Sequence, residues 1–500
     1  MNYNTIAEMF YDKMKNSLDD EFLFYKNKSK WKSLTGRDAL SIVEKISLSL
    51  YQHEIKFQDK VSILSNTSYK WALCDYGILS MGAVTTTIYP SLLPNQIEYI
   101  LNDSDTKLVF VEDLLQLEKV KSIFANCKKL KKIVVMDNSA ENEDGYIKNL
   151  NSFLVVNKDM LEKMDISFKD MVFKSKENDL ATLIYTSGTT GQPKGVMLSN
   201  KNLLSNIYGV SRIQKDIKNE IFLSFLPLSH VLERMAGHFY PLFINSKIYY
   251  AESMEKVADN LCEVGPTVAV CVPRFFEKMY NGVVKKVKIG SAFRQKLFWW
   301  AINTGKDYLA LIQSNKRLPL FLRLKHFIAN KLVYVKIRSK IGNKMKFFIS
   351  GGAPLSPDVA EFFASMSITI LEGYGLTETS PVLTSNTPDS VKFGYVGRPL
   401  DNVELKIASD GEILARGPNI MLGYYNKKEE TDKIIDSKGW FYTGDIGLID
   451  DQGYLKITDR KKSLIVTSGG KNIAPAPLEN ALLTSSYIDQ VSVIGDKKNF

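Results

Sequence analysis

The chain has 500 residues, a length that predicts about three domains at roughly 150 residues each. Hydrophobic residues make up 45% of it and charged residues 24%, proportions that exclude a largely disordered protein. The formal net charge is +10, and the four cysteines have no paired spacing, which excludes a disulfide scaffold and a cysteine-based zinc site and favours a cytoplasmic protein.

Neither end of the chain nor its interior predicts a membrane-spanning segment. The N-terminus lacks the apolar core of a signal peptide. The longest uncharged stretch, residues 76–97, contains Pro90 and Pro94 and is expected to form a buried helix, a turn and a strand.

Taken in chain order, residues 1–60 predict helices. From Val61 onward, short apolar runs alternate with helical patterns, which predicts βαβ units with helices covering parallel sheets. The runs are VSIL, AVTTTIYP, KLVFV, KKIVVM, ATLIYT, KIYY, TVAVCV, KFFIS and ITIL. After about Asp389, short strands with hairpin turns at DG and QG predict a small β-rich subdomain.

The predicted fold class is therefore α/β. We expect a large N-terminal domain of helix-covered, mostly parallel sheets over residues 1–458, with the β-rich subdomain at about 389–458. Residues 459–463 are expected to form a hinge that includes Lys462, and residues 464–500 to begin a smaller α+β domain.

The positive charge is concentrated in one window, residues 283–346, which holds sixteen Lys or Arg residues and one acidic residue, Asp307. The aromatic residues Phe293, Phe298, Trp299, Trp300 and Tyr308 are interleaved with this charge. A solvated helical face over a buried aromatic stripe is one interpretation. An interfacial helix on anionic lipid, or a site for an acidic acyl carrier protein, is the other. No nucleic-acid recognition motif accompanies the window, so we expect no nucleic-acid partner.

The segment YTSGTTGQPKG, residues 185–195, combines three glycines, four hydroxyl side chains and one lysine. Glycines allow the backbone to approach a ligand closely, and successive amides can form an anion-binding nest. The segment does not match a Walker loop, and it lies between two apolar runs. It is predicted to bind phosphate, although a flexible surface loop is the alternative.

Several motifs in order resemble the acyl-adenylate-forming superfamily, which includes acyl-CoA synthetases, adenylation domains of peptide synthetases and luciferases. They are YTSGTTGQPKGVMLSN, GYGLTETSP, GWFYTGDIG and DRKKSLIVTSGGKNIAP. FLPLSHVLERMAG and PTVAVCVPRFFEKMY resemble its long-chain fatty-acid CoA ligase branch more narrowly.

The resemblance implies that ATP and a fatty acid form acyl-AMP, and that the acyl group then passes to coenzyme A. Mg²⁺ would accompany ATP, with Thr186 and Glu378 as its protein ligands. Lys194, Glu378 and His230 would act in catalysis, with His230 beside the reacting carboxylate. The ATP or AMP site implied by the resemblance comprises Thr186, Ser187, Gly188, Thr189, Thr190, Gly191, Lys194, Gly351, Gly352, Ala353, Pro354, Gly373, Tyr374, Gly375, Leu376, Thr377, Asp445 and Arg460.

Four of these residues also have a purely structural interpretation. Glu378 matches a helix-capping pattern, His230 a structural histidine, Asp445 a turn cap and Arg460 a linker residue. The neighbouring Glu233 and Arg234 are expected to form a structural ion pair with each other.

Two alternative functions remain open. One is an acyl-[acyl carrier protein] ligase, and the other is an acyl-nucleotide binding protein that lacks the catalytic lid. Family members carry a C-terminal domain of roughly a hundred residues, whereas this chain ends at Phe500. We therefore expect ATP binding with weak adenylation. We also expect a cytoplasmic protein that associates with the inner face of the membrane.

Overall fold

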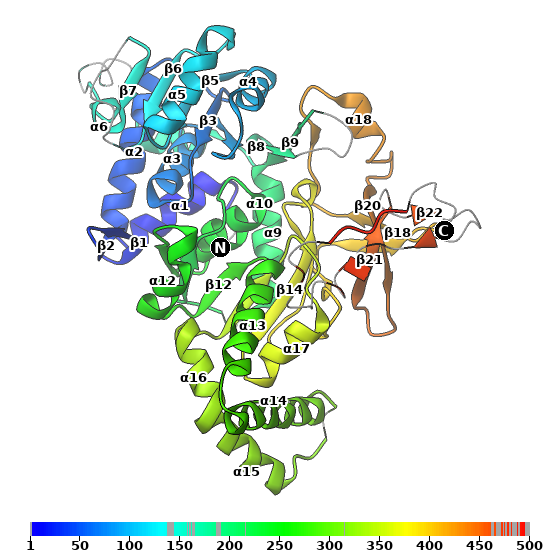
Figure 1. The fold of residues 1–500 in the computed structure, drawn as a ribbon. Helices are drawn as coiled ribbons and strands as arrows, with labels where there is room; N and C mark the ends of the chain where they lie inside the picture. The colour runs from blue at the N-terminus through cyan, green and yellow to red at the C-terminus, as the bar shows by residue number, and fades with distance from the viewer. Residues whose placement is uncertain are drawn as a thin grey trace. The chain divides into compact units, whose positions relative to one another are not determined.

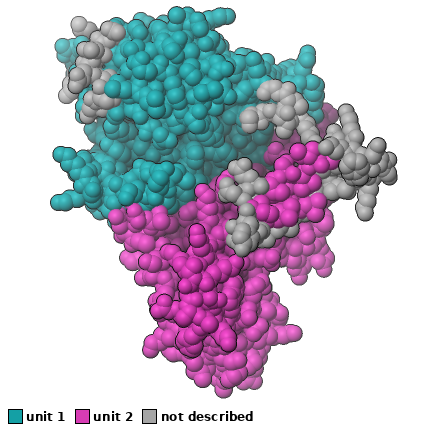
Figure 2. All heavy atoms as spheres, in the orientation of Figure 1, with its two compact units in different colours: residues 1–257, 376–381, 418–433 teal, residues 258–375, 382–417, 434–500 magenta. Residues whose placement is uncertain are grey.

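The computed structural model describes residues 3–137, 145–157, 159, 162, 166–186, 192–215, 217–314 and 316–461, together with scattered residues beyond 461. The chain forms two compact units (Figures 1 and 2). Unit 1 comprises residues 1–257, 376–381 and 418–433, and unit 2 comprises residues 258–375, 382–417 and 434–500. This division differs from the predicted boundaries at 458 and 463, which stay predictions.

Unit 1 begins with helix α1 (Ile6–Asn16), strands β1 (Glu21–Asn27) and β2 (Lys30–Thr35), and helix α2 (Gly36–Gln52). The prediction of helices throughout residues 1–60 is thus wrong for 21–35. There the chain forms an antiparallel hairpin whose turn residues, Lys28 and Ser29, both have positive φ. Strand β1 pairs in parallel with β11 (Lys247–Tyr250), and Phe24 stacks on Tyr249 with ring centroids 4.1 Å apart. This pairing with a distant strand overrides the local helical pattern.

The main sheet of unit 1 has eight strands in the order β19-β9-β8-β4-β3-β5-β6-β7. Six are β3 (Lys60–Leu64), β4 (Val84–Ile88), β5 (Thr106–Val111), β6 (Lys132–Val135), β7 (Ile147–Asn149) and β8 (Leu180–Thr186). These six run parallel, and β9 (Lys194–Ser199) and β19 (Gly423–Tyr424) add antiparallel pairs. All five residues of β4 are buried, as expected for a parallel strand covered on both faces.

Helices and a second strand group complete unit 1. Strands β10 (Ile221–Ser224) and β11 are parallel and continue through β1 to β2. The helices are α3 (Tyr69–Ser80), α4 (Pro94–Asp103), α5 (Leu114–Ile123), α6 (Leu150–Phe153), α8 (Phe168–Lys174), α9 (Asn200–Ile213), α10 (Val231–Glu233), α11 (Tyr240–Phe243) and α18 (Lys428–Asp432). Between α10 and α11 lies a π-helical turn, η2 (Arg234–Phe239), and a 3₁₀ turn, η6 (Thr377–Thr379), also belongs to this unit.

Unit 2 contains a second sheet with helices packed beside it. Strands β12 (Val268–Cys271), β13 (Phe347–Ser350) and β14 (Thr369–Gly375) are parallel, and β15 (Val382–Ser385) and β16 (Arg398–Pro399) continue antiparallel. The helices are α12 (Val257–Val264), which starts at the last residue of the preceding unit-1 segment, α13 (Pro273–Lys288), α14 (Ala292–Gln313), α15 (Leu320–Ala329), α16 (Val335–Arg338) and α17 (Pro357–Ser365). A π-helical turn, η4 (Asn330–Tyr334), joins α15 to α16.

The predicted β-rich subdomain is a four-stranded antiparallel sheet in unit 2. Its strands are β17 (Glu404–Ile407), β18 (Glu412–Arg416), β20 (Phe441–Ile449) and β21 (Leu455–Arg460). Gly411 and Gly453, the glycines of the two predicted hairpin turns, have φ of +86° and +82°. A two-stranded sheet, β22 (Ile465–Val466) and β23 (Asn472–Ile473), follows. The predicted α/β class is confirmed, and no helix within the described residues has the length and hydropathy needed to cross a membrane.

Candidate active site

The predicted phosphate-binding segment connects two antiparallel strands of unit 1. Thr186 is the last residue of β8, Lys194 is the first of β9, and the two are partners in the strand register. The intervening candidates Ser187, Gly188, Thr189, Thr190 and Gly191 lie outside the described residues. In its described part the segment therefore leads from a strand into a strand, whereas a Walker loop leads into a helix N-terminus.

The Lys194 ammonium lies among residues that no motif indicated. Its Nζ is 2.7 Å from Oε2 of Glu430 on α18 and 4.9 Å from the centroid of the Tyr424 ring. Hydrogen bonds from Lys194 and Lys433 lower the pKa of Glu430 to about 2. Glu430 is thus an ionised partner of the only cation in the predicted phosphate-binding segment.

Glu378 lies close to the same group. Its Oε1 accepts a hydrogen bond of 2.7 Å from the Tyr424 hydroxyl, and its backbone carbonyl accepts one of 2.9 Å from Met421 N. Burial, followed by the charge of Glu378, raises the pKa of Tyr424, which therefore stays protonated. The structure places Tyr424 between Lys194 and Glu378. In the η6 turn the amide of the N-cap residue Leu376 donates to the Thr379 hydroxyl, so Thr379 rather than Glu378 supplies the capping side chain.

His230 is half-buried at the start of α10. Its Nδ1 accepts a hydrogen bond of 3.2 Å from Leu232 N. Burial lowers the pKa of His230 below its ordinary value, so the ring is neutral at pH 7. Because Nδ1 is the acceptor, the proton of the neutral ring is on Nε2, which can donate to an anionic oxygen.

The loop before His230 is held by hydroxyl groups from neighbouring elements. The Thr67 hydroxyl donates to the Leu226 carbonyl over 2.6 Å and accepts from Leu228 N over 2.9 Å. The Thr87 hydroxyl, at the end of β4, donates to the Ser229 carbonyl over 2.9 Å. These bonds fix the backbone on which the imidazole of His230 stands.

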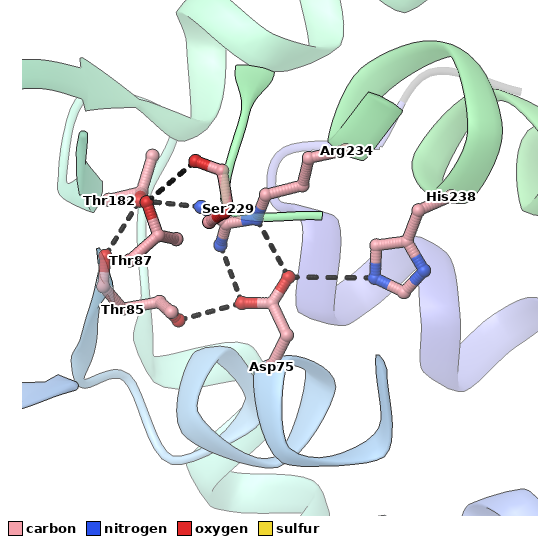
Figure 3. Close-up of polar contacts among 7 residues, drawn as sticks. All are labelled: Asp75, Thr85, Thr87, Thr182, Ser229, Arg234 and His238. Carbon is pink, nitrogen blue, oxygen red and sulfur yellow. Dashed lines mark hydrogen bonds and ion pairs between the residues drawn. The ribbon is translucent and has the colours of Figure 1, made fainter. Parts of the chain in front are cut away.

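Four residues after His230, Arg234 is the centre of a buried polar network (Figure 3). Its Nε donates to Asp75 Oδ2 over 2.9 Å, its Nη2 donates to Asp75 Oδ1, and its Nη1 donates to Thr182 Oγ1 over 2.6 Å. The expectation that Glu233 and Arg234 pair with each other is therefore wrong. Neighbouring residues in a helix point in different directions, and the carboxylate that faces Arg234 comes from α3.

The same network links two strands of the main sheet. Thr85 on β4 donates to Asp75 Oδ1 over 2.7 Å, and Thr182 on β8 donates to the Thr85 carbonyl over 2.6 Å. His238 Nε2 lies 3.5 Å from Asp75 Oδ2. Burial alone would raise the pKa of Asp75, but the Arg234 charge and the His238 contact outweigh it and lower that pKa. The ionised pair of Arg234 and Asp75 is thus hydrogen-bonded, through Thr182, to strand β8, which ends at Thr186.

Glu233 points to a different partner. Its Oε1 accepts a hydrogen bond of 2.6 Å from the Ser224 hydroxyl, and a Cβ at Gly237 would lie only 2.3 Å from that same oxygen. Burial raises the pKa of Glu233 to about 8. Glu233 is therefore a neutral carboxylic acid at pH 7, and Gly237 provides the space that it occupies.

The residues predicted to bind the nucleoside fall on unit 2. The Tyr374 hydroxyl, from β14, donates to Asp445 Oδ2 over 2.7 Å, and Arg460 Nε is 3.1 Å from Asp445 Oδ1. Asp445 and Arg460 are register partners on β20 and β21. Burial raises the pKa of Asp445, and the Tyr374 hydrogen bond and the Arg460 charge oppose that rise.

The remaining predicted residues flank these strands. Gly351, Gly352, Ala353 and Pro354 follow β13, Gly373 and Gly375 flank Tyr374 on β14, and Leu376 and Thr377 begin the next unit-1 segment. Gly352 has φ of +83°, and no other residue lies within 4 Å of the point that a Cβ would occupy there, so its backbone is open to a ligand. Lys462, the predicted hinge residue, lies outside the described residues.

The structure thus brings together Lys194 and Glu378 in unit 1, and Tyr374, Asp445 and Arg460 in unit 2. Sequence reasoning missed Tyr424, Glu430, Asp75 and His238. Asp75 carried one detectable signal, since it is an acidic residue within the otherwise apolar helix YKWALCDYGILS. Glu430 is one of several charged residues in NKKEETDK, so its sequence context did not single it out.

Comparison with known proteins gives a consistent result. A family model described as "AMP-binding enzyme" matches residues 10–425. The long-chain-fatty-acid–CoA ligase FadD15 of Mycobacterium tuberculosis is 33% identical, over 100% of this chain and 81% of that protein. The peroxisomal long chain acyl-CoA synthetase 6 of Arabidopsis thaliana is 31% identical, over 94% of this chain and 67% of that protein.

Solved structures show the same fold at lower identity. The anthranilate CoA ligase AuaEII, in complex with anthranoyl-AMP, has a TM-score of 0.76 at 19% identity, over 99% of this chain and 84% of that one. A fatty acyl CoA synthetase of Mycobacterium tuberculosis has a TM-score of 0.68 at 21% identity, over 99% and 86%. The match over residues 10–425 and the similarity to the two curated ligases show that this chain belongs to the AMP-binding enzyme family.

Proposed function

We propose that the protein activates a long-chain fatty acid with ATP and transfers the acyl group to coenzyme A. The observation that carries this proposal is the 33% identity to a long-chain-fatty-acid–CoA ligase over the whole of this chain. In the first step a carboxylate oxygen bonds to the α-phosphorus of ATP while the bond to pyrophosphate breaks. In the second step the coenzyme A sulfur bonds to the acyl carbon, its thiol proton is lost, and AMP departs.

Lys194 would stabilise the polyphosphate in the first step. A carboxylate approaching a polyphosphate is repelled by it, and a fixed cation offsets that repulsion. Lys194 Nζ is already 2.7 Å from the carboxylate of Glu430, so a phosphate oxygen would take the place of Glu430. Tyr424 would remain beside both Lys194 and Glu378 during this exchange.

Glu378 is suited to bind a Mg²⁺ ion that arrives together with ATP. Among the described residues, no group of three or more His, Cys, Asp or Glu side chains is placed to hold a metal ion. Magnesium is usually bound by one or two carboxylates with substrate phosphates, which agrees with a single carboxylate at this position. Glu378 Oε1 accepts from Tyr424, which orients the carboxylate, and Thr186 would add its hydroxyl oxygen. The ion would neutralise charge on the phosphates.

The unit-2 residues would bind the nucleoside. Asp445 would accept hydrogen bonds from the ribose hydroxyls, and its two oxygens are held by Tyr374 and Arg460. The Tyr374 ring would stack on adenine, with the backbone from Gly351 to Pro354 beside the base. We also propose that Arg460 reaches the ribose or phosphate. Residues 459–463, with Lys462, would be the hinge about which the following residues 464–500 move between the two reaction steps.

His230 would bind the fatty-acid carboxylate. Its neutral ring presents Nε2–H as a donor, and the hydroxyl bonds of Thr67 and Thr87 hold the loop before it. Donation to the carboxylate oxygen positions the acid without requiring a protonated imidazole. We further propose that the protein is cytoplasmic and associates with an anionic membrane surface through residues 283–346.

The test is ATP-dependent release of pyrophosphate by the full chain with Mg²⁺ and oleate. Hydroxylamine should trap acyl-AMP without coenzyme A, and added coenzyme A should give a thioester instead. Lys194→Ala removes the cation and leaves the loop amides, so this variant should release pyrophosphate more slowly than the unaltered chain. Absence of both ATP binding and oleate-dependent pyrophosphate release would refute the proposal. A thioester formed with acyl carrier protein but not with coenzyme A would identify the carrier protein as the acceptor.

A further inference from the structure

Helix α15 and the segment after it expose an unusual number of large apolar side chains. We call this set the α15 row, and it comprises Leu320, Phe321, Leu324, Phe327, Ile328, Leu332 and Val335. Leu320 is 81% exposed, Phe321 68% and Phe327 62%. Single exposed apolar residues are ordinary, whereas a contiguous group marks a surface that another body covers.

The row follows one face of the helix. The positions of Leu320, Phe321, Leu324, Phe327 and Ile328 span about 120° of the circumference at the helical repeat. Figure 1 shows α15 beside α14 at the lower end of unit 2, where Figure 2 also shows the tip of that unit. The row therefore forms a continuous apolar strip along one helix.

The opposite face of the segment is firmly packed on α14. His326 stacks on Tyr308 with ring centroids 3.9 Å apart, and the Tyr334 hydroxyl donates to the Ala301 carbonyl over 2.6 Å. Ala329 and Tyr334 are fully buried. These contacts bury the inner face of the segment against α14, so the α15 row is a second apolar face that is exposed in addition to the packed one.

Basic residues surround the row. They are Lys316, Arg317, Arg323, Lys325, Lys331 and Lys336, and none of the six makes an ion pair with a residue that the structure describes. No Asp or Glu occurs from residue 308 to residue 357. Lys325 Nζ lies 4.3 Å from the centroid of the Phe321 ring, so charge and apolar surface are in direct contact. A partner that accepts both must be apolar next to a layer of negative charge.

We infer that the α15 row inserts into the headgroup and acyl-chain boundary of an anionic membrane, with the surrounding cations at the lipid phosphates. Interfacial helices combine an apolar face with Lys and Arg in this way. A second copy of the chain fits poorly, because a symmetric contact would bring the same six cations together.

The inference deepens the proposed membrane association, and it rests on the proposed function only for its purpose, which is uptake of fatty acid from the bilayer. Within residues 283–346, the inference places the membrane contact on α15 rather than on Trp299 and Trp300 of α14. Trp299 is 39% exposed and Trp300 is partly buried, so both are less accessible than most of the α15 row.

The test is sedimentation of the full chain with vesicles. We expect binding to phosphatidylcholine vesicles that contain phosphatidylglycerol, little binding to pure phosphatidylcholine, and release at high salt. Leu324→Ser with Phe327→Ser should weaken binding by about tenfold or more, because two inserted side chains are lost. Arg323→Gln, Lys331→Gln and Lys336→Gln together should weaken it by about a hundredfold.

Leu115→Ser is the matched control, because Leu115 is 65% exposed on α5 of unit 1, away from the row in sequence and in unit. This variant should bind vesicles as the unaltered chain does. A tryptophan at Phe327 (Phe327→Trp) should be quenched by lipids brominated on their acyl chains, which reports insertion directly. Thermal unfolding of each variant shows whether its fold is intact.

Three results would overturn the inference. They are equal binding to neutral and anionic vesicles, unchanged binding after loss of the row residues, and a salt-resistant dimer that the same substitutions dissociate. Pyrophosphate release with water-soluble octanoate and no vesicles separates this inference from the proposed function. A chain that binds vesicles without releasing pyrophosphate refutes only the function, and a chain that releases pyrophosphate without binding vesicles refutes only the docking surface.

Discussion

Replacing Arg234 by methionine should be among the most destabilising single changes in unit 1. The Arg234 side chain is 2% exposed and its partner, the Asp75 carboxylate, is 0% exposed. Methionine keeps much of the volume but leaves a buried negative charge without its cation. Breaking a buried ion pair on one side costs about 3–5 kcal/mol. The loss of the 2.6 Å bond to Thr182 acts in the same direction.

Urea unfolding of Arg234→Met, Asp75→Asn and the double variant measures this coupling. Trp71 lies 5.6 Å from the guanidinium and provides a fluorescence signal close to the change. Because Asp75→Asn removes the charge that Arg234 balances, the double variant should lose at least about 2 kcal/mol less than the sum of the single variants. Arg37→Met is the control, since Arg37 and Asp19 form an exposed pair, and its unfolding midpoint should not change.

The pH dependence has a defined sign. The folded-state pKa of Asp75 is lowered, so the carboxylate contributes stability above its unfolded value of about 3.9 and loses that contribution as the pH falls through the folded value. Arg234→Met should abolish this acid-side loss. Additive energies in the cycle, within about 0.5 kcal/mol, would refute the coupling on which the reasoning depends.

Three further changes test the site. Glu378→Gln should preserve the fold and the Tyr424 contact while raising the Mg²⁺ concentration that half-maximal pyrophosphate release requires, and an unchanged requirement would contradict the ligand role. Glu430→Gln should release Lys194 and tighten ATP binding, measured by equilibrium dialysis, by about two- to fivefold, since a partly exposed ion pair is weak. Weaker ATP binding would show instead that Glu430 orients the lysine. Glu233 has its pKa raised to about 8, so the folded chain keeps a proton that the unfolded chain releases, and stability should fall as the pH rises from about 4.3 towards 8. Thermal unfolding of Glu233→Gln should show a smaller fall over this range.

The sheet strands after residue 60 could be predicted because their signal is local. Runs such as VTTTI and KLVFV are short, apolar and β-branched, and they became β4 and β5. The hairpin at 21–35 could not be predicted in the same way. Its strand β1 is stabilised by pairing with β11, whose residues lie more than two hundred positions later. Such a partner is absent from any local window of sequence.

The residues of the candidate site were also predictable only in part. The glycines, hydroxyls and single charge of residues 185–195 indicated a phosphate site with Lys194, because these groups are what phosphate recognition requires. Glu378, Tyr374 and Asp445 were indicated by the resemblance of their motifs to the acyl-adenylate-forming superfamily. Which groups face them depends on the folded chain. Tyr424 approaches Glu378 from 46 residues away.

The fold class, the positions of most strands and the residue types available for chemistry follow from the amino-acid sequence alone, because each depends on neighbours within a few positions. The ion-pair partners and the covered apolar faces depend instead on the folded chain. Arg234 pairs with Asp75, 159 residues away, rather than with the adjacent Glu233. Buried charges pair wherever the packing of helices and strands brings them together, since in an interior without water an unmatched charge is too unfavourable to remain. For the same reason an apolar stripe such as the α15 row becomes informative only when packing shows that no other described part of unit 2 covers it.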